Sequence, residues 1–506
     1  MLSKVTAGTT LGLHGVLVEV EVDVAGRGFP TFTIVGLPGK AIDEAKDRVR
    51  TAITNAGYEM PDSRITVNLA PADVPKSGTA FDLAIAMGIL ASSGMIPKKK
   101  LEDTMFIGEL SLEGHVRRVN GIIPLIILAQ DKQIGNIFIP AENAHEAAIF
   151  EHIHIYPVST LTQLISHFLD KNQIPLYVPV SVETHQSTSI STYDFSQIKG
   201  QEQAKRALEI AAAGFHNVHL KGSPGAGKTL LSRSMPTILP QMSKREMIEV
   251  AKIYSVIGDL SPSIFEGVRP FRSPHHTTSR IGLIGGGSNP APGEISLAHR
   301  GVLFLDEFPE FPRSVLESMR QPLEDGVVTI SRAAGSLTFP ARFLLLAASN
   351  PCPCGFLGHP KKACTCAPGL VSRYKKRLSG PLLDRIDLHL DVPPVEVSEL
   401  SDTFDSEESR VVRDRVIRAR DIQTARFAGT TLTFNSEMRS ADIKTFCEIE
   451  DAALAMLHTA VEKLLLSARS YFKIIKVAQT ISDLESSDSI KSHHVAEALQ
   501  YRAQEL

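Results

Sequence analysis

Short runs of alternating hydrophobic and polar residues open the chain. Between Val16 and Val22 every second residue is Val, with Leu or Glu between, which predicts a strand with one buried face. The same reasoning predicts strands over residues 31–35 and 64–69, and helical spacing predicts helices over 41–53 and 79–91. We therefore expect a mixed α/β domain over residues 1–170.

The pattern changes twice further along the chain. Residues 171–194 are rich in Ser, Thr, Pro and Val and lack a helical period, which is typical of a linker. Strand-like and helix-like runs then alternate over residues 195–395, as a parallel sheet requires. Residues 396–506 show helical patterns and almost no strand signal. The chain is thus expected to hold a second α/β domain followed by a helical domain.

One segment of the second α/β domain carries a phosphate-binding signature. Residues 222–229 fit G-x-x-x-x-G-K-[ST], directly after an apolar strand and at the start of a helix. Glycines let backbone N–H groups turn onto the phosphates, Lys228 reaches the β and γ oxygens, and the Thr229 hydroxyl ligates Mg²⁺. The predicted nucleotide-binding residues are Gly222, Ser223, Pro224, Gly225, Ala226, Gly227, Lys228, Thr229 and Leu230.

Two apolar runs that end in polar residues predict the rest of this site. Residues 302–305 lead into Asp306 and Glu307, and residues 343–348 lead to Asn350. The carboxyl ends of parallel strands meet at one edge of a sheet, where ligands bind. Asp306 is therefore expected to complete the Mg²⁺ shell, and Glu307 to polarise the attacking water. Asn350 is expected to hold that water from the other side, or alternatively to be a turn residue.

Two arginines are candidates for stabilising charge on the transferred phosphate. Arg385 follows a Pro-Leu-Leu-Asp stretch, from which it could reach the γ-phosphate of a neighbouring subunit. The alternative is a salt bridge with Asp384 and Asp387 of the same chain. Arg469 lies in the helical C-terminal region and could close onto the phosphates.

Charge and composition limit the partners. The net charge is −3, so no global field attracts nucleic acid, and any such site must be a local patch. Residues 267–293 and 361–380 contain basic residues but no acid, and each is a candidate patch or a solvated loop. No apolar stretch approaches the length of a membrane span, and the N-terminus lacks the apolar core of a secretory signal. We therefore expect a cytoplasmic protein with no membrane partner.

Four of the five cysteines form two closely spaced pairs, Cys352 with Cys354 and Cys364 with Cys366. Four thiolates suit tetrahedral Zn²⁺, although one-residue gaps are tighter than the common spacing. Four reduced thiols in a loop are the alternative. A zinc ion here would brace the loop that leads to Arg385.

Taken in order, these motifs resemble those of AAA+ ATPases of the Mg-chelatase-like branch. The segments 350–355, Asn-Pro-Cys-Pro-Cys-Gly, and 379–388, Ser-Gly-Pro-Leu-Leu-Asp-Arg-Ile-Asp-Leu, narrow the resemblance to the YifB/ComM family, over essentially the whole chain. The resemblance implies an AAA+ core with a parallel sheet and a helical lid, which binds ATP and Mg²⁺ in a homo-hexameric ring. It also implies that Asn350 is the sensor-one residue, Arg385 the finger that acts on a neighbour, and Arg469 the sensor-two residue.

The same resemblance implies an ATP-driven DNA motor. It implies branch migration in recombination during natural transformation, on single-stranded or branched DNA, with recombination proteins as potential partners. Members of this branch carry a helix-two insert, expected here near residues 273–290, and a hairpin before sensor one, expected over 327–339. Two apolar or β-branched runs flank a polar turn in the second segment. The expected DNA contacts are Arg280, Ser331 and Arg332, and an ordinary surface hairpin is the alternative.

The N-terminal domain resembles Lon proteases without their chemistry. Residues 73–82 resemble the segment around the Lon nucleophile, and residues 108–143 resemble a later strand–helix–strand segment. Ala80 stands where Lon has its serine, and the helix that would supply the lysine reads Ile-Ile-Pro-Leu over 122–125. A Ser–Lys hydrolase needs both groups within hydrogen-bond reach. We therefore expect a Lon-like fold without peptidase activity, because Ser77, a displaced candidate, lacks an obvious basic partner.

Two other functions remain as alternatives to a DNA motor. A protein remodeller would thread polypeptide with aromatic pore loops, and the predicted hairpin shows no aromatic-glycine signature. A chelatase subunit would couple ATP to metal insertion into a porphyrin, and the sequence shows no metal-binding integrin-like module.

Overall fold

The computed structural model describes residues 2–26, 29–37, 39–74, 76, 78–178, 193–287, 290–332, 335–394 and 407–503. The chain divides into two compact units. The first comprises Met1–His185 and Lys244–Phe265, and the second comprises Gln186–Ser243 and Glu266–Leu506. The segment Lys244–Phe265 therefore interrupts the second unit in sequence and belongs to the first in space. Most of the predicted linker, residues 179–192, lies outside the described residues.

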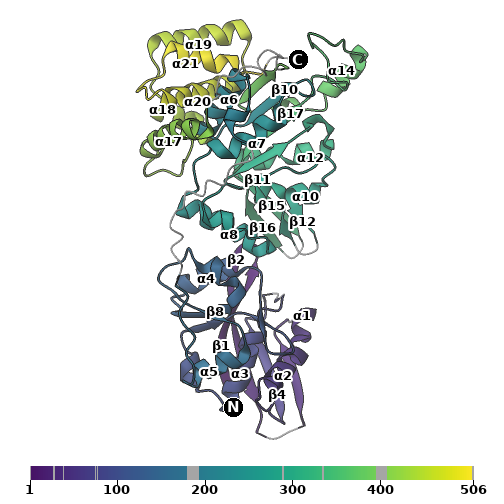
Figure 1. Ribbon diagram of the computed structural model, residues 1–506, viewed down its shortest axis with the longest axis vertical. Coiled ribbons are helices and arrows are strands. Elements are labelled where there is room, and N and C mark those ends of the chain that lie inside the picture. The colour runs from purple at the N-terminus through teal and green to yellow at the C-terminus, as the bar shows by residue number, and fades with distance from the viewer. Residues whose placement is uncertain are drawn as a thin grey trace. The chain divides into compact units, whose positions relative to one another are not determined.

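A sheet that includes β1, β2, β4 and β8 forms the centre of the first unit (Figure 1). It has seven strands, in the order β3-β4-β2-β1-β5-β8-β9. Its strands are β1 Leu2–Leu11, β2 His14–Val24, β3 Thr31–Val35, β4 Arg64–Ala70, β5 Thr104–Phe106, β8 Asn136–Pro140 and β9 His154–Val158. The pairs β1–β2 and β2–β4 are antiparallel, and the other neighbours are parallel. The three strands predicted from the N-terminal pattern correspond to β2, β3 and β4 and are confirmed.

Helices pack against this sheet. They include α2 Ala45–Asn55, α3 Asp82–Ser92, α4 Ile122–Asp131, α5 Leu161–Phe168 and α8 Lys244–Ile257. The helix predicted over 79–91 begins at Asp82, and the one predicted over 41–53 is divided at Glu44 into α1 Lys40–Asp43 and α2. Every residue of α3 is buried, since the helix is apolar all round and lies on β1 and β2. Gly88 permits this approach, because a Cβ there would lie 2.5 Å from Val22 Cγ2.

Helix α8 is tied into the first unit by Ser255. Its carbonyl oxygen accepts the Gly121 N–H at 2.8 Å, and its hydroxyl accepts the Ile123 N–H at 3.2 Å. The same hydroxyl donates to the buried Glu146 carboxylate at 3.0 Å. The Asn143 amide donates to that carboxylate at 2.7 Å. These bonds satisfy a carboxylate that would be costly to bury alone.

The second unit is built on a five-stranded parallel sheet in the order β11-β14-β17-β10-β18. Its strands are β10 Val218–Gly222, β11 Phe271–Arg272, β14 Val302–Leu305, β17 Leu344–Ser349 and β18 Leu388–Val392. Val302 and Phe304 pack in one cluster with residues of α6 Glu202–Gly214 and α7 Lys228–Ile238. Leu303 and Leu305 pack on the opposite face with α12 Arg313–Ser318. Both faces of the sheet are thus covered, as the continuous apolar runs predict.

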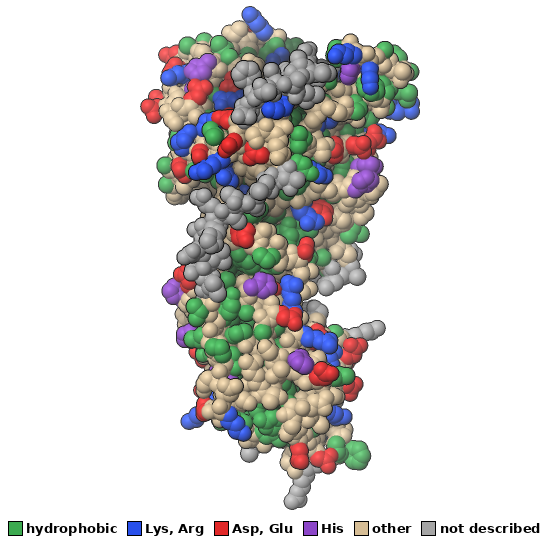
Figure 2. Space-filling model, viewed as in Figure 1, with side chains coloured by type: hydrophobic (Ala, Val, Ile, Leu, Met, Phe, Trp, Pro, Cys, Tyr) green, Lys and Arg blue, Asp and Glu red, His purple; other side chains and the backbone are tan. Residues whose placement is uncertain are grey.

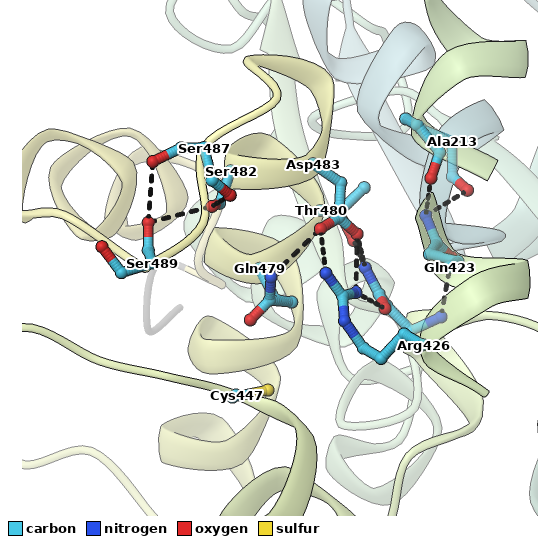
Figure 3. A network of polar contacts seen from close by, with 12 residues as sticks. Ala213, Gln423, Arg426, Cys447, Gln479, Thr480, Ser482, Asp483, Ser487 and Ser489 are labelled. Carbon is cyan, nitrogen blue, oxygen red and sulfur yellow. Dashed lines mark hydrogen bonds and ion pairs between the residues drawn. The ribbon is translucent and has the colours of Figure 1, made fainter. Parts of the chain in front are cut away.

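The C-terminal part is helical throughout residues 407–503, apart from turns and connections. Its main helices are α17 Ser409–Arg426, α18 Ser440–Phe446, α19 Asp451–Leu464, α20 Ala468–Leu484 and α21 Ser492–Gln500. A buried polar network centred on Asp483 joins α17 and α20 (Figure 3). The Asp483 carboxylate accepts from Arg426 at 2.9 Å and Gln479 at 3.0 Å. Gln423 donates to the Ala213 carbonyl at 3.2 Å and so joins α17 to α6.

Two small hairpins extend the second unit. Strands β15 Val327–Arg332 and β16 Gly335–Pro340 form the predicted hairpin, which is confirmed. Helix α10 Arg280–Ile284 and the pair β12 Gly285–Gly286 and β13 Ala291–Pro292 occupy the region of the predicted insert. Within the described part of the chain, no helix has both the length and the apolar character needed to cross a bilayer.

Candidate nucleotide-binding site

The phosphate-loop motif connects β10 to α7, as predicted. Gly225 and Gly227 have φ angles of +79° and +86°, which L side chains rarely adopt. Gly222 lies against β18, where a Cβ would stand 2.3 Å from the Val392 carbonyl oxygen. The backbone conformation and the close approach of β18 therefore require glycine at these positions. The loop continues directly into the N-terminus of α7, where backbone N–H groups favour anions.

Lys228 is buried in the first turn of α7. Its ammonium donates to the carbonyl oxygens of Gly222 at 2.7 Å and Ser223 at 2.9 Å, and to Asn350 Oδ1 at 3.3 Å. Burial lowers the pKa of this ammonium, and the Asp306 carboxylate opposes that shift. The lysine thus joins the phosphate loop to the end of β17.

Two oxygen donors suited to Mg²⁺ meet beside the loop. The Thr229 hydroxyl donates to Asp306 Oδ2 at 3.0 Å, and Asp306 Oδ1 accepts the Glu307 N–H at 2.9 Å. Hydroxyl and carboxylate oxygens are ligands that Mg²⁺ accepts, together with phosphate oxygens and water. The residues present therefore fit the metal that the motif implies.

Glu307 has a histidine partner that the sequence analysis did not assign. Its backbone is left-handed, with φ +50°, and its Oε2 lies 3.1 Å from His276 Nδ1. His276 follows β11, which pairs with β14, so both side chains leave the same edge of the sheet. Because β11 consists only of Phe271 and Arg272, no apolar run in the sequence points to His276. A polar partner at this distance orients the carboxylate.

Arg385 and Arg469 share one carboxylate. Arg385 follows α15 Gly380–Leu383 and forms an ion pair with Glu324 Oε2, and Arg469, in the first turn of α20, lies 2.9 Å from Glu324 Oε1. In the described part of the chain, Arg385 pairs with Glu324 and forms no ion pair with Asp384 or Asp387, and Asp387 Oδ2 lies 3.2 Å from His216 Nδ1. Within the described residues, neither arginine has a hydrogen bond or ion pair with the phosphate loop of its own chain.

The four clustered cysteines converge. Cys352 Sγ lies 3.4 Å from Cys354 Sγ and 3.6 Å from Cys364 Sγ, and the Cys354 N–H donates to Cys366 Sγ at 3.4 Å. All four sulfurs lie within 4.8 Å of one another. Tetrahedral Zn–S bonds of about 2.3 Å require sulfurs roughly 3.8 Å apart. Backbone N–H bonds from Phe356 and Thr365 lower the pKa of Cys354 to about 5, whereas burial and hydrogen bonds with Cys354 and Cys352 raise the pKa of Cys364 to about 12, so the fit to zinc rests on the geometry of the four sulfurs. The donor set therefore fits zinc.

The second basic segment forms a surface around α14 Pro368–Lys375. Figure 2 shows Lys and Arg side chains gathered over this helix. Lys361, Lys362, Arg373 and Lys376 are exposed and, within the described residues, pair with no acid. Arg377 differs, because it forms an ion pair of 2.5 Å with Glu310.

The expected DNA contacts are only partly described. Ser331 is exposed on β15, and its hydroxyl lies 3.3 Å from that of Ser336 on β16. Arg280 is exposed at the start of α10. The side chain of Arg332 lies outside the described residues.

In the first unit, residues 73–82, which resemble the segment around the Lon nucleophile, form hydrogen bonds within the fold. Ala80 directly precedes the N-cap of α3, and Ser77 lies outside the described residues. The buried Lys76 ammonium donates to the Pro71 carbonyl, and burial lowers its pKa. The Thr79 hydroxyl donates to Glu109. The absence of peptidase activity stays a prediction.

A cavity of about 240 Å³ is lined by Asn350 and by two buried histidines, His219 and His389, among other residues. His219 Nε2 lies 2.8 Å from the Ser349 hydroxyl, and the His219 and His389 rings meet edge to face at 5.7 Å. Burial lowers the pKa of His219 to about 3 and that of His389 to about 4. Both side chains are therefore neutral in the folded protein near pH 7.

We expect these histidines to make the protein less stable in mild acid. Below the unfolded pKa of about 6.5, the unfolded chain binds a proton that buried His219 does not, so unfolding is favoured. Between pH 6.5 and 5 this amounts to about 2 kcal/mol for His219. Urea unfolding of wild type and His219→Asn at pH 7.5, 6.5 and 5 measures it. The variant should lose part of the pH slope, whereas His458→Gln, which changes an exposed histidine, should keep it. Equal slopes in all three proteins would contradict the prediction.

Comparisons with known proteins agree on one family. Residues 194–400 match "Magnesium chelatase, subunit ChlI", residues 20–143 match "Subunit ChlI of Mg-chelatase", and residues 406–502 match its C-terminal part. The chain is 44% identical to the competence protein ComM of Haemophilus influenzae, over 99% of this chain and 97% of that protein. It is 41% identical to YifB of Escherichia coli, over 99% and 97%. It is 30% identical to a Lon protease of Rhizobium meliloti over 166 residues, 31% of this chain and 20% of that protein.

Proposed function

We propose that this chain, which belongs to the YifB/ComM family of Mg-chelatase-like AAA+ ATPases, is an ATP-driven DNA motor that works as a homo-hexameric ring in the cytoplasm. One observation carries the ATPase assignment. Lys228, Thr229, Asp306, Glu307 and Asn350 converge at the carboxyl edge of one parallel sheet. The relative named a competence protein supports a role in DNA uptake and recombination, with branch migration as the proposed reaction.

In the proposed mechanism, the loop N–H groups and Lys228 bind the phosphates, and Thr229 and Asp306 hold Mg²⁺. Bound at Thr229 and Asp306, the metal would supply positive charge that offsets the negative charge of the phosphates. Glu307, held by His276, accepts a proton from the attacking water and aims it at the γ-phosphate. Asn350, already in contact with Lys228, positions the same water. The first turn of α7 positions Lys228 and Thr229, and the ends of β14 and β17 position Asp306, Glu307 and Asn350.

The arginines complete the site of a neighbouring protomer. An arginine that serves another chain must face away from its own phosphate loop, and Arg469 is 43% exposed and paired only with Glu324 among the described residues. Two guanidinium groups around one carboxylate leave an excess positive charge, which attracts a triphosphate. We therefore assign Arg385 as finger and Arg469 as sensor two, both acting in trans.

The hairpin β15–β16 is the proposed DNA contact. Val328 and Phe339 are buried at its base, whereas the hydroxyls of Thr329, Ser331 and Ser336 lie on its exposed face. Hydroxyl groups bind phosphate oxygens without reading sequence, which suits a motor that must move along any DNA. Arg280 and Arg332 would add charge near the same strand of DNA.

The proposed action on DNA is tested by measuring whether DNA or unfolded polypeptide stimulates ATP hydrolysis. We expect single-stranded DNA and a four-way junction to stimulate hydrolysis, less so as salt rises from about 50 to about 200 mM, and unfolded polypeptide to have no effect. Ser331→Glu should weaken DNA binding by about threefold to tenfold, because it sets a charge against phosphate. Thr459→Glu, the same kind of change on exposed α19, should not. Stimulation by polypeptide instead of DNA would identify a protein remodeller.

The proposal includes a structural zinc ion at the cysteine cluster. We expect about one zinc per chain by atomic emission, and its loss in Cys354→Ser/Cys364→Ser. Loss should lower the melting temperature and slow hydrolysis, since the loop between Asn350 and Arg385 would lose its brace. Cys447→Ser, which changes a cysteine outside the cluster, should keep the metal. Zinc-free purified protein would contradict the assignment.

A further inference from the structure

We infer that Glu324 is a positioning residue that holds Arg385 and Arg469 until the triphosphate of the neighbouring protomer draws them away. When the arginines leave Glu324, the β15–β16 hairpin moves. The inference rests on the proposed function, because it adds Glu324 to the two arginines that are proposed to act on the neighbour's nucleotide. Neither the motifs nor the comparisons assign a role to Glu324. It lies in α13 Arg320–Asp325, the helix that leads into β15.

Glu324 lies on α13 and contacts two other elements, the connection between α15 and β18 and the start of α20. Arg385 comes from the connection between α15 and β18, and Arg469 comes from the first turn of α20, 145 residues from Glu324. Arg385 also donates to the Pro381 carbonyl at 2.6 Å. The two hydrogen bonds from these arginines lower the pKa of Glu324, so its carboxylate is charged at neutral pH.

The strength of this contact suits a switch. The Arg469 and Glu324 side chains are 43% and 51% exposed, and ion pairs between exposed side chains are weak. The Arg385 side chain is only 13% exposed, so a stronger competitor is needed to draw it from Glu324. A triphosphate with Mg²⁺ offers more acceptor oxygens and charge than one carboxylate does. The buried Arg385 Nε has no hydrogen-bond partner among the described residues, so the guanidinium has a donor that Glu324 does not satisfy. The arginine therefore gains bonds when it moves to phosphate.

A movement of Glu324 on α13 would pass directly to the β15–β16 hairpin. Helix α13 ends at Gly326, whose N–H donates to the Pro322 carbonyl at 3.0 Å and whose carbonyl accepts the Ala341 N–H at 2.8 Å. Ala341 directly follows β16, so the end of α13 is bonded to the base of the hairpin. Gly326 also packs closely, because a Cβ there would lie 2.8 Å from Arg342 Cγ. A shift of α13 therefore displaces both strands of the hairpin together.

The test compares Glu324→Gln with wild type as full-length protein. The amide keeps the shape and removes the charge, so the arginines should reach the neighbour's triphosphate more easily. Since Glu324 and the hairpin are coupled, DNA on the hairpin would normally favour this release, and the variant should no longer need it. We expect DNA-free ATP hydrolysis to rise about fivefold and the ratio of DNA-stimulated to basal rate to fall by a similar factor. Glu317→Gln breaks the neighbouring 2.7 Å pair with Arg320 and should leave both rates unchanged.

Hydrogen exchange of the hairpin gives a readout that does not need DNA. In wild type, a slowly hydrolysed ATP analogue should change exchange of the amides in β15 and β16, and in Glu324→Gln the analogue should change it little. Unaltered basal rate together with an unaltered nucleotide response of the hairpin would overturn the inference. A lower basal rate would also overturn it, because Glu324 would then support catalysis. Failure of DNA to stimulate wild type would instead count against the proposed DNA motor and leave the exchange result to decide on Glu324.

Discussion

Glu307→Gln protein is expected to bind ATP and to hydrolyse it about a hundredfold to ten-thousandfold more slowly than wild type. The amide cannot accept the proton of the attacking water, whereas Lys228, Thr229 and Asp306 still hold the nucleotide and Mg²⁺. Steady-state hydrolysis gives the rate, and binding of a fluorescent ATP analogue shows that the site remains intact. The loss should therefore appear in kcat with little change in KM.

Glu310→Gln is the matched control for this change. Glu310 lies three residues further along and carries the ion pair with Arg377, so the substitution removes a nearby carboxylate without touching the proposed base. We expect hydrolysis within about twofold of wild type, since exposed pairs contribute little. A Glu307→Gln protein that hydrolyses ATP at the wild-type rate would remove Glu307 from the mechanism.

Arg385→Ala protein is expected to lose about 10³-fold or more of its hydrolysis rate in the assembled ring. An arginine finger stabilises charge on the transferred phosphate, and no other described residue of this connection, residues 380–387, carries a guanidinium. Arg377→Ala, in the segment just before it, should have a small effect. The rate is measured with and without DNA at protein concentrations that support assembly.

Mixing two inactive proteins tests whether the finger acts in trans. A ring of Arg385→Ala and Glu307→Gln chains contains some interfaces where an intact Glu307 faces an intact Arg385. Random 1:1 assembly makes about a quarter of the interfaces complete, so part of the activity should return. If mixed rings form, as co-purification of a tagged chain would show, and hydrolysis stays absent, the finger serves its own chain.

The fold and the centre of the site could be predicted because their signals are local. The phosphate loop, Asp306, Glu307 and Asn350 each follow an apolar strand, and parallel strands bring their ends together regardless of the loops between. The parallel sheet, the helical C-terminal part and the family are confirmed. The roles of Arg385 and Arg469 stay predictions, since no neighbouring chain is described.

Other features could not be read from the sequence, because they depend on contacts between distant segments. His276 stands in a basic stretch with no period that ties it to Glu307. Glu324 meets Arg469 across 145 residues. The placement of α8 in the first unit is of the same kind, since an amphipathic helix fits many partners. Its packing on α4, the bonds of Ser255 with Glu146 and residues 121–123, and the Lys244–Glu151 ion pair fix which partner it joins.

The split origin of the first unit limits how this protein can be dissected. A fragment that stops at residue 178 would leave Glu146 without the Ser255 hydroxyl and uncover the side of α4 on which α8 packs. Such a fragment should aggregate, and cutting the gene at the linker would not yield two independent modules. A first unit produced on its own would therefore need residues 244–265 grafted back onto the shorter piece.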